Sequence, residues 1–232
     1  SSTAAYQCTF MRYHRVGNDN VGTPLDTVAN LPAQVQAAPD SAWKGCDWAP
    51  GFTFVVPAGW TSGIHGAELS APGLSTFRIS FVVKPAPGAR GDFAVLANTN
   101  TWNAYNDWGG RSKYTSTPAH ELGFLRPNPS ARPTGTSATN HQARAELWVL
   151  DWLASSGYAC DVYTDHDLHR GIPGLACYRG FILNTHPEYW SVEMFDHLED
   201  YLDGGGSLAY MGGNAIYERV VFSADGRSLT FF

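Results

Sequence analysis

The order of apolar segments after residue 91 constrains the fold more than any other feature of the sequence. Residues 93–97 form a continuous apolar run, which is typical of a parallel strand buried on both faces. Residues 141–156 place apolar side chains at helical spacing. The chain then continues as predicted strand, strand, helix and strand at 160–163, 180–183, 192–202 and 207–211. This order predicts an open, mainly parallel sheet with helices outside it.

Residues 1–88 follow a different pattern. Short runs of β-branched and aromatic residues are separated by Gly and Pro, at 6–11, 52–56, 63–69 and 77–83. Strands without helices between them predict an N-terminal, immunoglobulin-like β-sandwich, with polar residues 18–45 as a loop. We therefore expect two domains, a β-sandwich over 1–88 and an amidotransferase-like α/β catalytic domain over 89–232, which residues 222–232 close as a hairpin.

Charge and cysteine content argue against several classes of partner. The 15 Lys and Arg residues face 21 Asp and Glu residues, so the net charge of −6 argues against nucleic-acid binding. No apolar run approaches the roughly 20 residues of a membrane span, so we expect no membrane contact. We expect a cytoplasmic protein with four reduced thiols. Pairing of Cys8 with Cys46 and of Cys160 with Cys177 would instead indicate a secreted protein.

Three polar segments follow the predicted parallel strands at the point where each ends, at 98–110, 184–190 and 212–214. Ligands of parallel sheets bind outside the carboxyl ends of the strands. The sequence therefore predicts that four residues lie together in one crevice: Tyr105, His186, Glu188 and Asn214. The stretch 98–140 lacks periodicity and is rich in aromatic residues, so we expect an ordered functional loop there.

The predicted strand–turn–helix around residue 188 offers a carboxylate and an imidazole. Glu188 and His186 suit a metal ligand with a general base, or an acid/base pair. Alternatively, Glu188 caps the following helix and His186 packs beneath it. No cysteine lies at these strand ends, so a thiol nucleophile is not supported. Residues 165–169 (DHDLH) match no standard ligand spacing, and we interpret them as structural, with Asp165 as a helix N-cap.

Four motifs point to a known family. They are WTSGIH at 60–65, NTWNAYNDWGG at 100–110, HPEYW at 186–190 and GGN at 212–214. Together they resemble the catalytic core of the large subunit of N,N-dimethylformamidase, over roughly residues 50–225. The resemblance implies hydrolysis of an amide at a mononuclear iron ion, with two tyrosines and one glutamate as its protein ligands.

The resemblance carries over residue by residue. Tyr105 matches one of the two tyrosine ligands and Glu188 matches the glutamate. His65 stands where the motif context puts the other tyrosine. Imidazole is a competent iron ligand but carries no negative charge, so the change would favour Fe(II) or admit zinc. His186 and Asn214 match positions that assist catalysis, and Trp102, Trp108 and Tyr189 are expected to enclose the substrate.

A second departure is the length of the chain. The family's large subunit is several times longer and supplies a catalytic carboxylate from downstream, so this protein either does without that carboxylate or replaces it with Glu121 or Glu218. Because Phe232 directly follows a predicted strand, we expect either a compact variant or a shortened chain.

We expect a metal-dependent hydrolase of small, N-substituted formamide-like amides, in which a metal-activated water attacks the carbonyl. It would act as a homo-oligomer or with a companion subunit. The alternatives are a mononuclear iron lyase or oxygenase on the same scaffold, and a metal-free binding or structural module.

Overall fold

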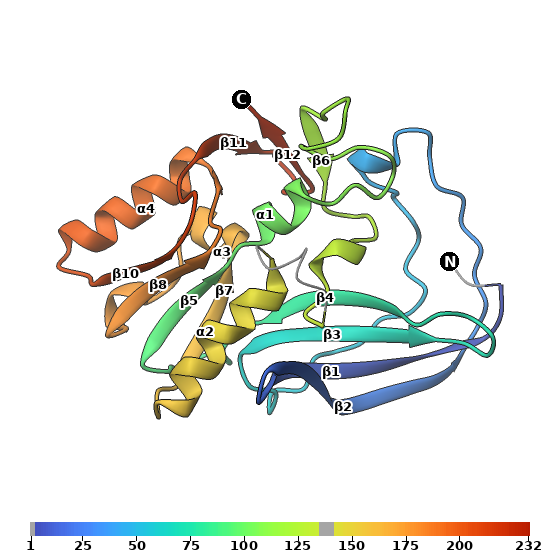
Figure 1. Cartoon of the computed structure of the whole chain (residues 1–232), viewed down its shortest axis with the longest axis horizontal. Helices are drawn as coiled ribbons and strands as arrows, with labels where there is room; N and C mark the ends of the chain where they lie inside the picture. The colour runs from blue at the N-terminus through green and yellow to red at the C-terminus, as the bar shows by residue number, and fades with distance from the viewer. Residues whose placement is uncertain (1–2, 135–141) are drawn as a thin grey trace.

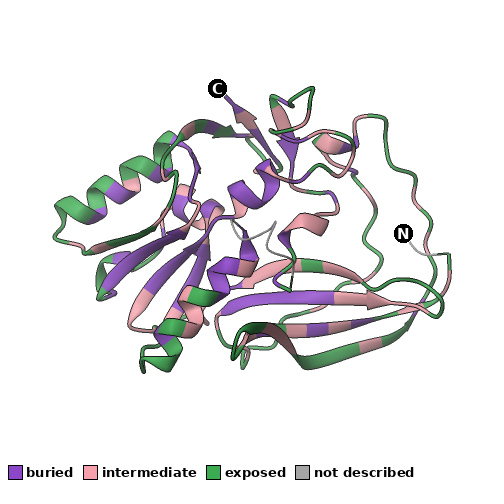
Figure 2. Cartoon of the chain, in the orientation of Figure 1, coloured by how far each residue is buried: buried purple, intermediate pink, exposed green. Residues whose placement is uncertain are grey.

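The computed structural model describes residues 3–134 and 142–232, and it builds the second half of the chain around a parallel sheet (Figure 1). Its strands are β5 (Phe93–Ala97), β7 (Cys160–Thr164), β8 (Gly180–Thr185) and β10 (Leu208–Gly212). They pair in the order β10-β8-β5-β7, each pair parallel. The central strands β5 and β8 are almost wholly buried (Figure 2). The mainly parallel sheet predicted from the sequence is confirmed.

Helices cover both faces of this sheet. On one face, α2 (Ala143–Ser155) packs Leu153 against Val95 and Ile182. On the other face lie α3 (Asp165–His169) and α4 (Val192–Asp203), in the same core cluster as Leu96 and Phe181. Alternating residues of β5 and β8 thus enter different cores. The predicted helix over 141–156 corresponds to α2, although residue 141 lies outside the described residues.

The N-terminal part is one antiparallel sheet. Its strands are β1 (Tyr6–Val16), β2 (Asp19–Leu31), β3 (Gly63–Ser70) and β4 (Phe77–Val83), in the order β2-β1-β3-β4. The prediction of a two-sheet sandwich is wrong for the described residues of this part. Residues 19–31, predicted as loop, form β2, whose side chains are mostly exposed and do not alternate between polar and apolar, so the period of a strand is hidden. Residues 52–56, predicted as strand, make no sheet pairing.

In place of a second sheet, a coil segment covers one face of the N-terminal sheet and the α/β part covers the other. Phe52, Phe54 and Trp60 pack over Cys8 and Phe10 on one face, and the rings of Phe10 and Phe54 stack at 4.0 Å. An apolar segment can therefore cover a sheet without joining a ladder of its own, which the sequence pattern does not reveal.

The opposite face of the N-terminal sheet contributes Tyr13 and Ile64 to a core shared with Trp102 and Leu147 of the α/β part. This shared core crosses the boundary between residues 88 and 89. The division into two domains there stays a prediction.

A third sheet crosses the end of the parallel sheet. It contains β6 (Glu121–Gly123), β9 (Tyr189–Trp190), β11 (Glu218–Phe222) and β12 (Ser228–Phe231), in the order β6-β12-β11-β9. The hairpin of β11 and β12 agrees with the predicted closing hairpin, although it begins four residues earlier. The stretch after β5 opens with the short helix α1 (Thr99–Ala104), and 3₁₀ turns occupy Ala42–Lys44, Pro129–Ala131 and Leu175–Cys177.

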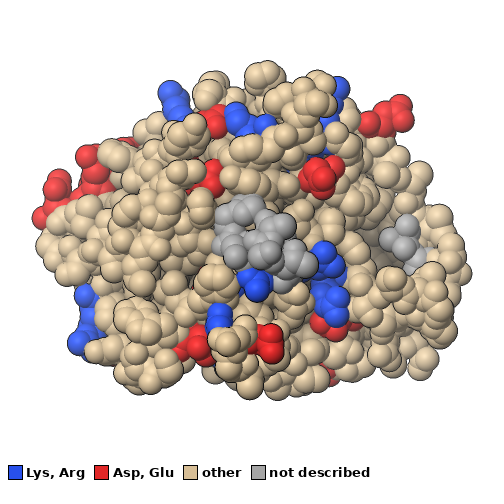
Figure 3. All heavy atoms as spheres, in the orientation of Figure 1, with Lys and Arg blue, Asp and Glu red and all other residues tan. Residues whose placement is uncertain are grey.

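The structure bears on the sequence-based expectations for cysteines and membranes. All four cysteines are unpaired, which agrees with the expectation of reduced thiols, and neither of the alternative disulfides forms. Within residues 3–134 and 142–232, no helix is both long and apolar enough to cross a bilayer. Figure 3 shows acidic side chains grouped at the edge of the molecule where α4 lies, while basic side chains are scattered over the rest of that view. The outer side of α4 is thus a solvated surface.

Candidate functional site

A sharp turn after β8 brings residues 186–188 to the carboxyl end of the parallel sheet. Thr185 has a φ of 57°, a left-handed conformation that is rare for a β-branched residue and indicates backbone strain. The backbone N–H of Glu188 then donates to the carbonyl of His186 at 2.9 Å, across Pro187. The turn places the Glu188 side chain where it is only 1% exposed.

Helix α1 is bonded along its side to this turn. The Thr101 hydroxyl donates to the carbonyl of His186 at 2.6 Å. The Asn100 side-chain amide donates to the carbonyl of Tyr189 at 2.9 Å, and that of Asn98 donates to the carbonyl of Asn184 at 2.8 Å. Asparagine and threonine in the 98–101 segment therefore fix α1, and Tyr105 at its end, against residues 184–189.

Five side chains form what we call the Glu188 cluster: Tyr105, Tyr114, His186, Glu188 and Tyr189. The Tyr105 hydroxyl donates to Glu188 Oε1 at 3.2 Å, and His186 Nδ1 lies 3.1 Å from the same oxygen. The Tyr114 hydroxyl donates to Glu188 Oε2 at 3.1 Å and is hydrogen-bonded to the Tyr189 hydroxyl. Each carboxylate oxygen of Glu188 thus accepts a hydrogen bond from a phenol.

The protonation of the cluster follows from its burial. Desolvation, and in addition the negative charge of Glu188, raise the pKa of Tyr105, Tyr114 and Tyr189 well above the usual value for a phenol. The three phenols are therefore neutral at pH 7 in the metal-free protein and can serve as hydrogen-bond donors. Tyr114 is 53% exposed, so the cluster reaches solvent past its ring.

Two further carboxyl groups lie buried at the beginning of α1. Glu146 Oε1 accepts from the backbone and side-chain amides of Asn98, both at 3.1 Å, and from Trp102 Nε1 at 2.9 Å. Glu146 Oε2 is buried with no hydrogen-bond partner. Asp165 Oδ2 accepts from the Asn100 N–H at 2.7 Å. Burial raises the pKa of Glu146 to about 8 and that of Asp165 to about 7. These carboxyls hold α1 in place.

His65, the histidine expected to bind the metal, does not join the cluster. Its neighbour Ile64 packs toward the α/β part, and alternation along a strand turns the next side chain to the opposite face. The His65 ring is stacked between Trp60 and Phe81, at centroid distances of 5.5 and 6.0 Å. Burial lowers the pKa of His65. The expected ligand set of His65, Tyr105 and Glu188 is therefore not brought together.

Two of the three residues expected to enclose substrate face elsewhere. Trp102 and Trp108 line a cavity of about 860 Å³ between the N-terminal sheet and the 124–131 segment. Residues 99, 102 and 103 form the side of α1 that faces this cavity, and residue 106, just beyond the helix, lines it as well. Asn100 and Thr101 lie on the side of α1 that is bonded to residues 186–189. Only Tyr189 belongs to the Glu188 cluster.

Residues after β10 form one rim of the cluster. The Gly213 N–H donates to the Thr185 carbonyl at 2.8 Å. A Cβ on Gly212 would lie 2.6 Å from that same carbonyl oxygen, so only glycine permits this approach. A Cβ on Gly213 would lie 3.4 Å from the His186 ring, and Asn214 follows Gly213, exposed, with a φ of 51°. Asn214 therefore lies on the rim, next in the chain to the glycine beside His186.

The two candidate replacement carboxylates differ in position. Glu218 forms an ion pair with Lys113, and its backbone N–H donates to the carbonyl of Glu188 at 3.0 Å. Glu121 on β6 is paired with Lys44 at 2.8 Å, and the side chains of both residues are more than one-third exposed. Only Glu218 is bonded to the backbone of the Glu188 turn.

The alternative role for Glu188 as a helix cap is wrong, because Ser191 caps α4 by accepting from the Met194 N–H at 3.2 Å. The structural interpretation of residues 165–169 agrees with α3, although its N-cap is Thr164 and not Asp165.

No group of three or more His, Cys, Asp and Glu side chains among the described residues is placed to hold a metal ion. A metal site at Glu188 therefore requires phenol oxygens.

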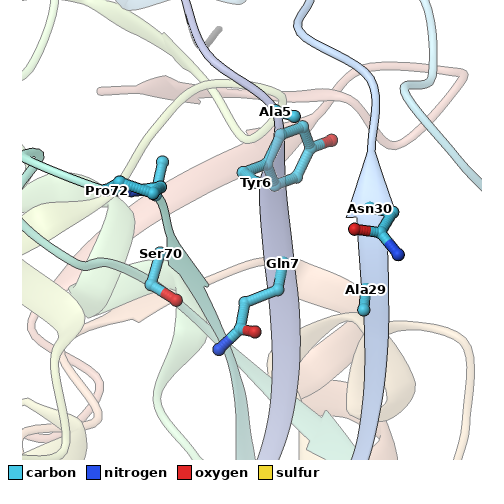
Figure 4. Close-up of a pocket in the computed structure, with 8 residues that line it drawn as sticks. Ala5, Tyr6, Gln7, Ala29, Asn30, Ser70 and Pro72 are labelled. Atoms are coloured by element: carbon cyan, nitrogen blue, oxygen red, sulfur yellow. The ribbon is translucent and has the colours of Figure 1, made fainter.

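A smaller pocket lies at the far end of the N-terminal sheet (Figure 4). It measures about 500 Å³ and lies between the ends of β1, β2 and β3. Tyr6, Gln7, Asn30 and Ser70 supply its polar side chains, and no carboxylate or imidazole lines it. It offers no group for acid/base or metal chemistry.

Tyr114 is the member of the Glu188 cluster that sequence reasoning missed. It lies in the stretch 111–119, where no periodicity or recognisable motif marks it, and eight residues separate it from Tyr105. No sequence signal identifies its role, because its contacts with Glu188 and Tyr189 bridge 74 and 75 residues.

Comparisons with known proteins agree with the resemblance found in the motifs. Residues 10–230 match the family described as "N,N-dimethylformamidase beta subunit-like, C-terminal". The beta subunit of N,N-dimethylformamidase from an Alcaligenes species is 26% identical over 211 residues, and that from Paracoccus aminophilus is 25% identical. Each alignment covers 74% of this chain and 28% of the relative, so the chain spans little more than a quarter of their length. The match begins some forty residues earlier than the motifs suggested and includes most of β1.

Proposed function

This chain belongs to the N,N-dimethylformamidase beta subunit-like C-terminal family, and we propose on that basis that it hydrolyses the C–N bond of small amides. N-substituted formamides are the proposed substrate class, since both curated relatives are named for one. The observation that carries the proposal is the convergence of Tyr105, Tyr114 and His186 on the buried Glu188 carboxylate. A motif matched to an amidase thus folds into a compact set of side chains whose chemistry suits acid/base catalysis and would suit a metal ion.

The donor chemistry of the cluster fits a single metal ion. Tyr105 and Glu188 would hold it, because phenol and carboxylate oxygens are hard donors that suit iron, with zinc as the alternative. A bound ion would polarise the amide carbonyl and lower the pKa of a water molecule. The relatives' designation as beta subunits supports a companion subunit for this chain as well.

The chain's own side chains would handle the proton and the oxyanion. His186 Nδ1 is oriented by Glu188 Oε1 at 3.1 Å, so Nε2 is the atom that delivers a proton to the leaving amine. Asn214 on the rim would donate its amide to the carbonyl oxygen as negative charge develops there. Trp102 and Trp108 are not included among the substrate contacts, because they line the cavity on the other side of α1.

The test is an assay of purified protein loaded with iron or zinc, with N,N-dimethylformamide as substrate and with released dimethylamine and formate as readouts. Wild type should release both products in equal amounts, with and without oxygen. Glu188→Gln should release neither, and Glu199→Gln on the exposed side of α4 serves as the matched control.

Two results would overturn the proposal. One is metal-loaded wild type that releases no amine from formamides or acetamides, which would favour a binding or structural module. The other is turnover that requires oxygen or forms no acid, which would favour an oxygenase or a lyase on the same scaffold.

A further inference from the structure

The Glu188 cluster contains a second phenol beside Tyr105, whereas His65 lies outside the cluster. Tyr114 donates to Glu188 Oε2 at 3.1 Å, and Tyr105 donates to Oε1 at 3.2 Å. The two phenol rings are tilted by 32° with centroids 4.1 Å apart. Two phenol oxygens therefore lie within 3.2 Å of one carboxylate, so the three groups are close enough to share a single ion.

The backbone around Tyr114 is held firmly enough to present this oxygen. The Lys113 N–H donates to the carbonyl of Ala104 at 2.9 Å, which ties the segment to the end of α1. The Tyr114 N–H donates to Ser112 Oγ at 3.0 Å. The Lys113 ammonium is paired with Glu218 and lies 5.0 Å from the centre of the Phe231 ring. Tyr114 is thus anchored on both the α1 side and the β11–β12 side of the cluster.

A third phenol, that of Tyr189, contacts the phenol of Tyr114. The Tyr189 hydroxyl is hydrogen-bonded to the Tyr114 hydroxyl, and its ring is fixed edge-on against Phe231 at 5.2 Å. Because the Tyr114 hydroxyl already donates to Glu188, it accepts from Tyr189. This bond would persist if the Tyr114 oxygen became an anion, because a phenolate oxygen still accepts. Tyr189 is therefore placed to support Tyr114.

We propose that Tyr114 is the second phenolate ligand of the metal site, in place of His65, and that Tyr189 is the residue that positions it. The inference rests on the proposed metal site and sharpens its chemistry. Two phenolates and one carboxylate carry three negative charges, whereas a set with His65 would carry two. Hard, strongly anionic ligands favour Fe(III) over Fe(II) and zinc.

Iron binding without substrate tests this inference separately from the proposed hydrolysis. The full chain is loaded aerobically with iron, and two quantities are measured: bound iron per chain under chelator competition, and the phenolate-to-Fe(III) charge-transfer absorbance per bound iron. Wild type should bind one iron and give resonance Raman lines of coordinated phenolate.

The variants give distinct expectations. Tyr114→Phe should lose about half of the absorbance per iron, and its iron affinity should fall by at least about tenfold, the scale seen even for groups one shell further out. Tyr105→Phe should behave in the same way, and the double variant should lose the band. His65→Gln and the distant Tyr158→Phe should retain both quantities. Tyr189→Phe should keep its iron and shift the energy of the band.

Several outcomes would overturn the inference. One is a full-strength band per iron in Tyr114→Phe, another is loss of iron in folded His65→Gln, and a third is no bound iron in folded wild type. If Tyr114→Phe does not fold, ring-deuterated tyrosine in wild type counts the coordinated phenolates, and a count of one overturns it. If two phenolates bind iron but no amide is cleaved, the ligand assignment stands and the proposed hydrolysis fails.

Discussion

Two glutamates at the same end of the parallel sheet are equally buried and differ in every partner. Glu188 and Glu146 are each 1% exposed. Glu146 accepts from a backbone amide, a side-chain amide and an indole, none of which ionises near neutral pH. Glu188 accepts from two phenols and lies beside an imidazole, all of which can give up protons or bind a metal.

The difference shows that burial alone does not mark a functional carboxylate. The donors around Glu146 belong to Asn98 and Trp102, at the beginning of α1, and so this carboxyl fixes the helix. The donors around Glu188 come from α1, from the following loop and from the turn after β8, and one of them reaches solvent. Partners that converge from separate segments and can titrate are the better indicator of chemistry.

The largest expected effect separates the two glutamates by activity. Glu188→Ala should lower turnover of a small amide by more than about 10³-fold, the upper end for loss of one stabilising group. The physical reason is that the phenols and His186 lose the acceptor that gathers them. Turnover of metal-loaded protein is the measurement. If Glu188→Ala were as active as wild type, Glu188 would not differ from Glu146 in its role, and the proposed distinction between a catalytic and a structural carboxylate would be wrong.

His186 tests whether the imidazole beside Glu188 moves a proton. His186→Ala should reduce the turnover number by about 10²–10⁴-fold, the usual contribution of a general acid or base. His120→Ala, at an exposed histidine before β6, is the matched control. With an amide whose amine is a better leaving group, the difference in turnover number between His186→Ala and wild type should become smaller. The reason is that such an amine needs less protonation in order to leave. A purely structural role for His186 predicts no such narrowing.

Glu146 should show the opposite profile, with a loss of stability. Glu146→Ala leaves the Asn98 and Trp102 donors buried without an acceptor, so the free energy of unfolding should fall by about 3 kcal/mol. Glu146→Gln retains an acceptor oxygen and should cost less. Urea unfolding of the metal-free protein measures both. A Glu146→Ala protein of wild-type stability would mean that Asn98 and Trp102 find other acceptors.

The smallest effect is the part of the pH dependence of stability that Glu146 contributes. Burial raises the pKa of Glu146 to about 8, so the folded state binds its proton more tightly than the unfolded chain does. Its stabilising contribution is complete below about pH 4.5 and is lost as pH rises through 8. Glu146→Gln should therefore gain stability relative to wild type between pH 5 and pH 8. Parallel curves would show that Glu146 is ionised in the folded protein.

Local patterns predicted much of the α/β part. The apolar run of β5, the Ser191 cap of α4 and the order of strands and helices were readable because each depends on residues close in the chain. The N-terminal sheet was harder. The largely exposed strand β2 showed no alternation of polar and apolar residues, and Phe52 and Phe54 resembled a strand although they cover a sheet as coil.

The sequence by itself determined the turn that carries His186 and Glu188, the placement of Tyr105 in the segment that follows the strand at 93–97, and the family to which the chain belongs. Only the tertiary structure decided which groups meet Glu188. His65 is excluded because the register of β3 turns it into the N-terminal core between Trp60 and Phe81. Tyr114 is included because Lys113 binds both the end of α1 and Glu218, which brings a segment without any local pattern onto a carboxylate 74 residues away.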